Sequence, residues 1–281
     1  MSDAPGTPAT SGSPDRPGIP HAPGTPDDTG SPDTPAPPAE SMPSQLTART
    51  FTGWPAWADL PLDVVSYGPD CPTEAQLRLL GRLEGKRVLD LGCGGGPISV
   101  AMVKQGAKVI SVDSSVEQLG HARRLGEREE VTLELHQGDL AELAFVRADT
   151  IDLVVSVYAL GMVNDLDRVF RQVHRVLRPD AHFVISLAHP AGRACDSGGP
   201  PAIRRSYWDS SPITWTDAGE HGADHPVTVT ELFTSLSRAN FLVDTILEPE
   251  PPASGTRSRW WRPAMAWLPS TLIVRARKLG T

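Results

Sequence analysis

Cysteine is scarce in this chain of 281 residues, which contains only Cys71, Cys93 and Cys195. The three are widely spaced, and no Cys-x-x-Cys pair occurs. This usage excludes a disulfide framework and argues against a zinc site, so no metal site is expected. It is typical of a protein in the reducing cytoplasm, which is the location we predict.

Long apolar runs and clusters of basic residues are missing as well. No stretch approaches the roughly 20 apolar residues that a membrane-spanning helix needs, so we predict no membrane span. The formal net charge is −8, and Lys and Arg form no block. Nucleic acid, whose binding depends on neutralising phosphates, is therefore not an expected partner.

Residues 1–50 differ in composition from the rest of the chain. They consist largely of Pro, Gly, Ser, Thr and Asp and contain almost no large apolar side chain. Such a segment cannot bury enough apolar surface to offset the entropy lost on ordering, so we predict a disordered tail. A segment that binds a partner is the alternative. Residues 51–281 suffice for one large domain with a sizeable core.

Within this domain, segments with strand and helix patterns alternate. Strands are predicted at 86–91, 107–113, 131–136, 150–157, 182–188, 242–249 and 270–279, and helices at 73–83, 97–106, 116–126, 165–177 and 228–241. Thr73 and Ser114 are predicted N-caps because Gln or Glu follows three residues later, and Pro179 should end the fourth helix. The alternation predicts an α/β fold, a Rossmann-like doubly wound sheet of seven mostly parallel strands with helices on both faces. The irregular segment 190–227 is predicted to be a cap insertion.

A glycine-rich loop, "VLDLGCGGGP" at residues 88–97, follows the first predicted strand. Ligands of such sheets bind beyond the carboxyl ends of the strands, and glycines let a ligand approach the main chain closely. The dinucleotide pattern Gly-x-Gly-x-x-Gly fits at Gly92 and Gly94, but its third position is Pro97, which lacks the N–H that a phosphate would use. The pattern Asp-x-Gly-x-Gly-x-Gly is matched in full from Asp90 to Gly96.

This second pattern resembles motif one of the class I S-adenosylmethionine-dependent methyltransferases. The resemblance continues along the chain. Asp113 ends the second predicted strand, where that family has a ribose-binding acid, and "HQGDLAEL" after the third strand looks like the adenine segment. Residues 149–186 are similar to strand four, the following helix and strand five of the small-molecule, UbiE-like branch (methyltransferase type 11).

The resemblance implies S-adenosyl-L-methionine as the cofactor and assigns roles to particular residues. Asp113 would accept hydrogen bonds from both ribose hydroxyls, Asp139 from the adenine amino group, and Asp90 would act on the methionine ammonium. Tyr67 is placed near the methionine end. The full set of predicted cofactor-binding residues is Asp90, Gly92, Cys93, Gly94, Gly96, Asp113, Ser114, Gln118, Gly138, Asp139, Leu140, Ser156 and Tyr67.

The acceptor should lie at the carboxyl edge of the sheet, under the predicted cap. His189 follows strand five and is the first candidate for a general base, with Tyr158 and His225 as the others. The cap contributes Tyr207, Trp208 and Trp215. The aromatic run at 259–267 either lines the same pocket or covers a sheet edge.

The predicted function is methyl transfer to a small organic acceptor, by in-line displacement at an O, N or C nucleophile. Strand four lacks the Asn/Asp-Pro-Pro-aromatic signature of amino-methyltransferases that act on nucleobases, which agrees with the acidic composition. Two alternatives remain open from the residues. One is a non-catalytic module that binds S-adenosylmethionine or a partner, and the other is an NAD(P)-dependent oxidoreductase.

Overall fold

The computed structural model describes residues 60–195, 202–217, 220–253, 255, 257, 258 and 261–280. The predicted tail, 1–50, and Trp260 lie outside the described residues. All described residues belong to one compact unit, Pro43–Thr281.

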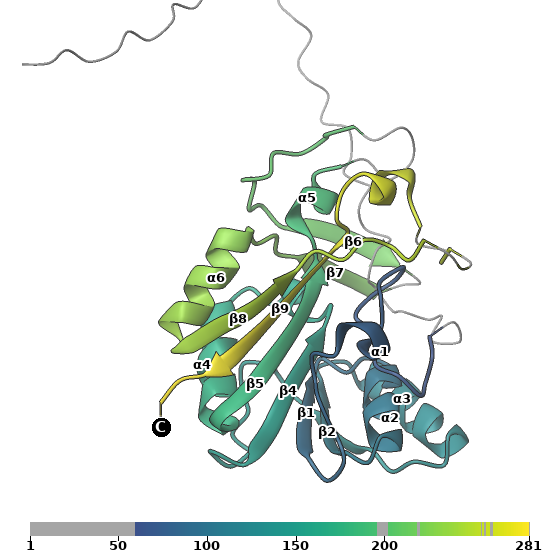
Figure 1. Cartoon of the computed structure of the whole chain (residues 1–281), viewed down its shortest axis with the longest axis vertical. Coiled ribbons are helices and arrows are strands. Elements are labelled where there is room, and N and C mark those ends of the chain that lie inside the picture. The colour runs from purple at the N-terminus through teal and green to yellow at the C-terminus, as the bar shows by residue number, and fades with distance from the viewer. Residues whose placement is uncertain are drawn as a thin grey trace, which may run out of the picture. The chain divides into compact units, whose positions relative to one another are not determined.

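Seven strands form a single sheet in the order β3-β2-β1-β4-β5-β9-β8 (Figure 1). They are β1 Arg87–Leu91, β2 Lys108–Asp113, β3 Glu134–Gln137, β4 Ile151–Val157, β5 Leu177–Ala188, β8 Phe241–Leu247 and β9 Thr271–Lys278. Only β9 runs antiparallel to its neighbours, β5 and β8. The predicted α/β class and seven-stranded, mostly parallel sheet are confirmed. The strand order reverses between β1 and β4, where such sheets bind their ligands.

Helices cover both faces of the sheet. They are α1 Glu74–Leu77, α2 Pro97–Lys104, α3 Val116–Arg128, α4 Leu166–Val176, α5 Pro190–Arg193 and α6 Val229–Arg238, with 3-10 turns η2 Leu160–Met162 and η3 Pro263–Ala266. Figure 1 shows α1, α2 and α3 on one side and α4 and α6 on the other. Successive strand residues serve opposite faces, so Leu89 packs in the core cluster under α4 and α6, while Val88 packs in the cluster under α2.

The predicted helix 73–83 is wrong beyond its first turn. Its N-terminal capping box at Thr73 is present, but α1 ends after Leu77 because Arg78 has a left-handed φ of 53°. The Glu74 carboxylate accepts hydrogen bonds from the N–H groups of Leu79 and Leu80, at 2.9 and 2.8 Å. This side chain therefore replaces the helical carbonyl acceptors that those residues would need.

Two further helix boundaries differ from the predictions. The N-cap of α3 is Ser115 rather than Ser114, because the Asp113 carboxylate accepts from the Ser115 N–H and the Ser115 side chain accepts from Gln118 N. Helix α4 ends at Val176, and Pro179 lies within β5 instead of ending the helix. The chain changes directly to extended backbone at Leu177, which pairs with Ile151 of β4.

The segment predicted as an irregular cap contains regular structure. Helix α5 follows β5, and an antiparallel hairpin is formed by β6 Ile213–Asp217 and β7 Glu220–Asp224. Figure 1 shows α5 and the hairpin beyond the end of the sheet at which β4 and β5 finish. The hairpin was missed because its second strand contains Gly222 and Ala223, which have low strand propensity.

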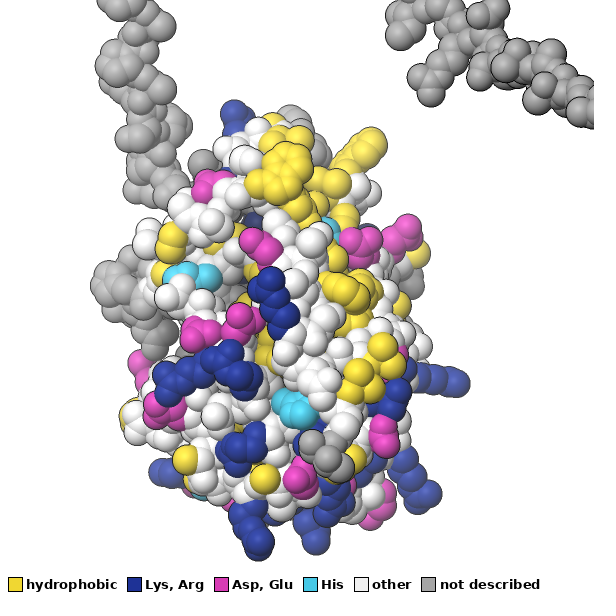
Figure 2. All heavy atoms as spheres, turned by 90° about the vertical axis from the view of Figure 1, so that its left-hand side faces the viewer, with side chains coloured by type: hydrophobic (Ala, Val, Ile, Leu, Met, Phe, Trp, Pro, Cys, Tyr) yellow, Lys and Arg dark blue, Asp and Glu magenta, His cyan; other side chains and the backbone are white. Residues whose placement is uncertain are grey.

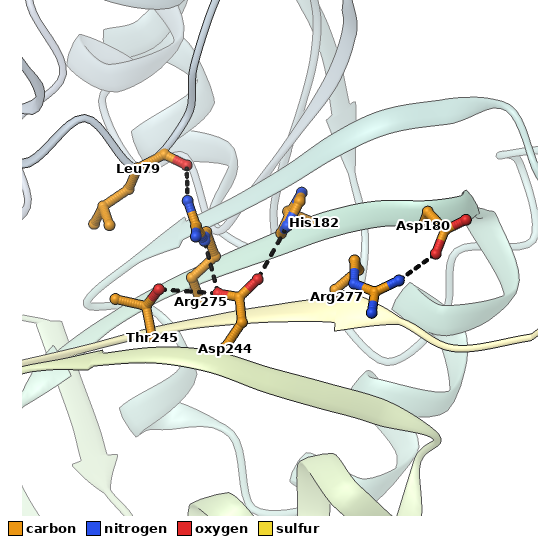
Figure 3. Close-up of polar contacts among 7 residues, drawn as sticks. All are labelled: Leu79, Asp180, His182, Asp244, Thr245, Arg275 and Arg277. Atoms are coloured by element: carbon orange, nitrogen blue, oxygen red, sulfur yellow. Dashed lines mark hydrogen bonds and ion pairs between the residues drawn. The ribbon is translucent and has the colours of Figure 1, made fainter.

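Polar contacts hold the antiparallel side of the sheet together (Figure 3). Asp244 of β8 accepts from Arg275 Nε of β9 at 2.8 Å and lies 3.1 Å from His182 Nε2 of β5. Arg275 Nη1 also donates to the Leu79 carbonyl at 3.3 Å. The network therefore joins three strands to the segment after α1.

Basic and apolar side chains are distributed unevenly over the surface. Figure 2 shows Lys and Arg side chains over the lower part of one face and apolar side chains gathered at its upper end. Trp208, Ile203 and Trp267 are 81, 79 and 78% exposed. Trp208 therefore faces solvent rather than lining an acceptor pocket. Within the described ranges, no helix has the length and apolar character needed to cross a membrane.

Candidate cofactor and acceptor site

The glycine-rich loop joins β1 to α2 and is fastened to β2. The N–H groups of Gly92 and Cys93 both donate to the Val112 carbonyl, at 2.8 and 3.0 Å. Gly92, Gly94 and Gly96 have left-handed φ values of 82°, 52° and 85°. Side-chain-bearing residues rarely adopt such values, so the loop conformation itself requires glycine.

Close packing also requires glycine at two of these positions. A Cβ atom at Gly92 would lie 2.0 Å from the Ala159 Cβ, just after β4, and one at Gly96 would lie 2.9 Å from the Ala122 Cβ in α3. From the sequence, the approach of a ligand was the expected reason for these glycines. The structure shows that contacts within the protein also demand them.

Asp113, at the end of β2, connects the loop to the next helix. Its Oδ2 accepts from the Gly94 N–H at 2.8 Å, and its Oδ1 accepts from the Ser115 N–H at 2.9 Å. The residue is half-buried. Each carboxylate oxygen can accept more than one hydrogen bond, so both can still receive a hydroxyl group from a ligand.

A pocket of about 690 Å³ opens beside Asp113. Its walls come from the ends of β1, β2 and β3 and from the segment after β4. The lining residues are Gly92, Asp113, Ser114, Gln137, Gly138, Asp139, Leu140, Ala141, Ala159, Met162, Val163, Asn164, Asp165 and Arg168. Six of the predicted cofactor-binding residues, Gly92, Asp113, Ser114, Gly138, Asp139 and Leu140, are thus brought together.

The wall formed by residues 162–168 was not predicted. Arg168 pairs with Glu142 across 2.6 Å, which joins this wall to the segment that carries Asp139. The sequence pattern placed Arg168 only in an amphipathic helix. No local signal links it to the pocket, because the two ion-pair partners are 26 residues apart in the chain.

Other predicted cofactor-binding residues do not line this pocket. Ser156 is buried and donates to the Leu91 carbonyl at 2.7 Å, so it joins β4 to β1. Tyr67 is buried in the core cluster under α2, and its hydroxyl donates to Glu74 at 2.6 Å. Cys93, Gly94, Gly96, Gln118 and Asp90 also lie outside the lining. The Gln118 Oε1 atom is buried and has no hydrogen-bond partner among the described residues.

Asp90 lies beneath the loop rather than in the pocket. It shares the strand face of Val88, and its Oδ2 accepts from Ser99 Oγ of α2 at 2.5 Å. Ser99 Oγ lies 2.8 Å from Ser111 Oγ. Burial raises the pKa of Asp90 to about 7. The hydrogen bond from Ser99 lowers this pKa, whereas the charge of Asp113 raises it.

This shifted pKa predicts a pH-dependent stability. Between the ordinary value of 3.8 and about 7, the folded chain holds the Asp90 proton more tightly than the unfolded chain. The stabilisation is therefore complete below the unfolded-state pKa of 3.8 and is lost as the pH rises through the folded-state pKa of about 7. We expect the free energy of unfolding to change by up to about 4 kcal/mol, because each unit of pKa difference corresponds to about 1.36 kcal/mol.

Urea unfolding from pH 4 to pH 8 measures this pH-dependent stabilisation, with Asp90→Asn as the matched variant. Asparagine keeps the volume and an acceptor for Ser99 but has no proton to lose. The free energy of unfolding of the wild type relative to the variant should fall across this range. A constant difference would contradict the prediction.

His189, the first candidate base, has partners on both ring nitrogens. Nε2 lies 2.7 Å from Glu248, and Nδ1 accepts from the Ala191 N–H at 3.1 Å, which caps α5. Burial lowers the pKa of His189, and the contact with Glu248 opposes this. In this arrangement neither nitrogen is open to a substrate proton.

Tyr158 and His225 are placed differently. Tyr158 has a left-handed φ of 58°, and its hydroxyl lies 2.5 Å from Thr271 Oγ1. Burial raises the pKa of this hydroxyl well above its ordinary value. His225 is half-buried at the end of β7, and its backbone N–H donates to the Gly161 carbonyl of η2 at 2.7 Å. Its imidazole has no hydrogen-bond partner among the described residues.

Sequence reasoning also missed an ion pair above η2. Arg193 Nη1 of α5 lies 2.6 Å from Asp224 Oδ2 of β7, and the two side chains are only 14 and 5% exposed. The pair connects the β6–β7 hairpin to α5, the helix after β5. Neither residue belongs to a motif, and 31 residues separate them in the chain, so no local pattern points to the contact.

Comparisons with known proteins show which proteins this chain is similar to. Residues 89–185 match a family model described as a methyltransferase domain. A solved structure of an S-adenosylmethionine-dependent methyltransferase from Mesorhizobium loti is similar, with 30% sequence identity and a TM-score of 0.61. The similarity covers 73% of this chain and 96% of that one.

Curated relatives are similar over a shorter segment. A ubiquinone biosynthesis O-methyltransferase from Aeromonas salmonicida is 38% identical over 106 residues, which is 38% of this chain and 44% of that protein. One from Hahella chejuensis is 36% identical over 104 residues, or 37% of this chain and 44% of that protein. The chain thus matches less than half the length of these relatives.

Proposed function

Because the chain belongs to the class I S-adenosylmethionine-dependent methyltransferases, we propose that it transfers the methyl group to a hydroxyl oxygen of a small organic acceptor. S-adenosylmethionine is the cofactor of the family. The names of the curated relatives, which are O-methyltransferases, support oxygen over nitrogen or carbon. The pocket beside Asp113 carries the proposal.

The residues of that pocket fit the cofactor. Asp113 at the end of β2 and Asp139 just after β3 supply two carboxylate acceptors to the lining, suited to ribose hydroxyls and an adenine amino group. Asp139 Oδ1 is fixed by the Ala141 N–H at 2.8 Å. Arg168 is the only cation among the lining residues, and it already pairs with Glu142. This donor set suits a nucleoside without phosphate.

When bound, S-adenosylmethionine supplies a methyl group on a positively charged sulfur, the leaving group of an in-line displacement. The chain must hold that methyl and the acceptor oxygen in line and keep water out. Orientation of this kind contributes about 7–11 kcal/mol in well-aligned systems. We propose that the loop at Gly92–Gly96, braced by Asp113, fixes one reactant and the cap fixes the other.

A hydroxyl acceptor must lose its proton to a base, and two observations support His225 in that role. Its backbone is anchored to Gly161 of η2, beside the pocket-lining Ala159 and Met162. Unlike His189, its imidazole is not held by a carboxylate or a backbone N–H. We therefore propose His225 as the general base and His189 as the residue that positions α5 through Glu248.

The experiment measures methyl transfer from S-adenosylmethionine to catechol, an aliphatic alcohol, an amine and an enol, by mass spectrometry. We expect methylated catechol. His225→Gln should lower its kcat by a factor of about 100, the lower end of the range for general bases. S-adenosylhomocysteine affinity should stay within a factor of about 2, because His225 does not line the cofactor pocket.

His121→Gln is the matched control, since His121 lies on the exposed side of α3. It should leave transfer intact. Methylation of the amine or the enol alone would contradict transfer to oxygen. Full activity of His225→Gln would remove His225 as the base.

A further inference from the structure

The Arg193–Asp224 ion pair lies beyond the carboxyl end of β5. Arg193 is four residues after His189, beyond the carboxyl end of β5, and Asp224 ends the cap hairpin. A Cβ atom at Gly161 would lie 3.5 Å from Arg193 Nη2 and 3.9 Å from Asp224 Oδ1. The pair therefore lies beside Gly161 of η2, which stands between the pocket-lining residues Ala159 and Met162.

The guanidinium of Arg193 uses little of its hydrogen-bonding capacity. Nη1 donates to Asp224, and the remaining guanidinium N–H groups have no hydrogen-bond partner among the described residues. A guanidinium carries five N–H donors. Arg193 is 14% exposed, and none of its nitrogens is among the buried side-chain atoms that lack a partner. Its remaining donors are therefore open to solvent and can be reached by a ligand.

The surroundings favour a negative charge on such a ligand. Gly161 has no side chain and so leaves space in front of Nη2. Burial lowers the pKa of Arg262, and the charge of Arg193 lowers it further, so a second guanidinium lies within electrostatic range. The charge of Arg193 also acts on Tyr158, at the end of β4. The charge of Arg193 is thus felt by groups that follow β4 and precede η3.

We propose that Arg193, held in orientation by Asp224, binds a carboxylate on the acceptor molecule. This inference rests on the proposed function and specifies its substrate class: a small hydroxylated acid. A carboxylate is planar and matches the two parallel N–H groups of a guanidinium edge, which gives both affinity and orientation. Asp224 occupies one position on the fork and leaves the others for the acceptor.

Binding of two acceptor analogues tests the proposal without relying on turnover. 3,4-Dihydroxybenzoate and catechol share the same hydroxyl groups and differ by a carboxylate. With S-adenosylhomocysteine-loaded protein, calorimetry should show the acid binding at least about 10-fold more tightly, the factor that 1.4 kcal/mol of charge-assisted hydrogen bonding gives. Arg193→Gln should abolish this preference, and Arg193→Lys should restore only part of it.

Arg238→Gln removes the same charge from the exposed last turn of α6 and is the control. If Arg193→Gln fails to fold because Asp224 is left buried without a partner, the double variant Arg193→Gln/Asp224→Asn removes both charges and should also show no preference. Equal or absent binding of both analogues to the wild type would overturn the proposal, as would a preference that survives these substitutions.

The two proposals can fail separately. A carboxylate preference in binding, lost in Arg193→Gln but without any methylated catechol or 3,4-dihydroxybenzoate, supports the role of Arg193 and contradicts transfer to a hydroxyl oxygen. Methylation of catechol without a carboxylate preference in binding supports transfer to a hydroxyl oxygen and contradicts the role of Arg193.

Discussion

Asp113→Ala is expected to weaken S-adenosylhomocysteine binding by on the order of 100-fold or more while the chain still folds. In our proposal, the carboxylate accepts both ribose hydroxyls. Charge-assisted hydrogen bonds contribute about 1.5–3 kcal/mol each, so losing two of them produces at least that factor.

Asp113 has a second role that the substitution also removes. Its oxygens accept from the N–H groups of Gly94 and Ser115, which hold the loop and the start of α3. These are also charge-assisted hydrogen bonds, which contribute about 1.5–3 kcal/mol each, and Asp113 is half-buried, so the free energy of unfolding should fall by about 3 kcal/mol. A domain of this size tolerates such a loss, and α3 keeps its own cap at Ser115.

Calorimetry with S-adenosylhomocysteine and urea unfolding separate these two effects. Asp113→Asn is the matched variant because its amide oxygen can still accept one hydrogen bond. It should retain more stability than alanine but still bind weakly, since the charge is gone. Wild-type affinity in Asp113→Ala would contradict the ribose assignment.

Gly92→Ala should destabilise the fold by about 2–5 kcal/mol, the sum of a left-handed backbone and an overpacked contact. The φ of Gly92 is 82°, and the added Cβ would meet the Ala159 Cβ at 2.0 Å. Neither group is the end of a flexible side chain, so the loop or the segment after β4 must move. Both border the cofactor pocket, and S-adenosylhomocysteine binding should weaken as well.

Two variants divide this effect into its causes. Gly138→Ala is the control, because that glycine has no positive φ and an added Cβ there would meet no atom within 4 Å. The double variant Gly92→Ala/Ala159→Gly removes the contact and keeps the backbone strain, so it should recover part of the loss. Urea unfolding measures the free energy of unfolding of all three variants. Equal stability of Gly92→Ala and Gly138→Ala would contradict the prediction.

The sheet was predictable because its signals are local. Continuous apolar runs at β1, β4 and β5 mark strands buried on both faces, and the glycine loop marks the end of β1. The pocket followed from the same logic, since the ends of neighbouring parallel strands meet at one edge. Asp113, Gly138 and Asp139 each follow or end a strand, so strand positions were enough to bring them together.

The failures came from side chains that act across the chain or against a local pattern. The leucines after Thr73 have helical spacing, but the Glu74 carboxylate captures the N–H groups of Leu79 and Leu80 and ends the helix early. Ser114 has a capping sequence, but Asp113 shifts the cap by one residue. The partners of His189 and Arg193 are 59 and 31 residues away, beyond any periodicity.

The position of β9 has a consequence for protein synthesis. This strand, Thr271–Lys278, lies between β5 and β8, although β8 is made before it. A nascent chain that has not yet emerged from the ribosome as far as Lys278 has β5 as an open edge and β8 with no partner in the sheet. Open strand edges invite pairing with other chains, so chaperone protection should matter most between the emergence of β8 and that of β9.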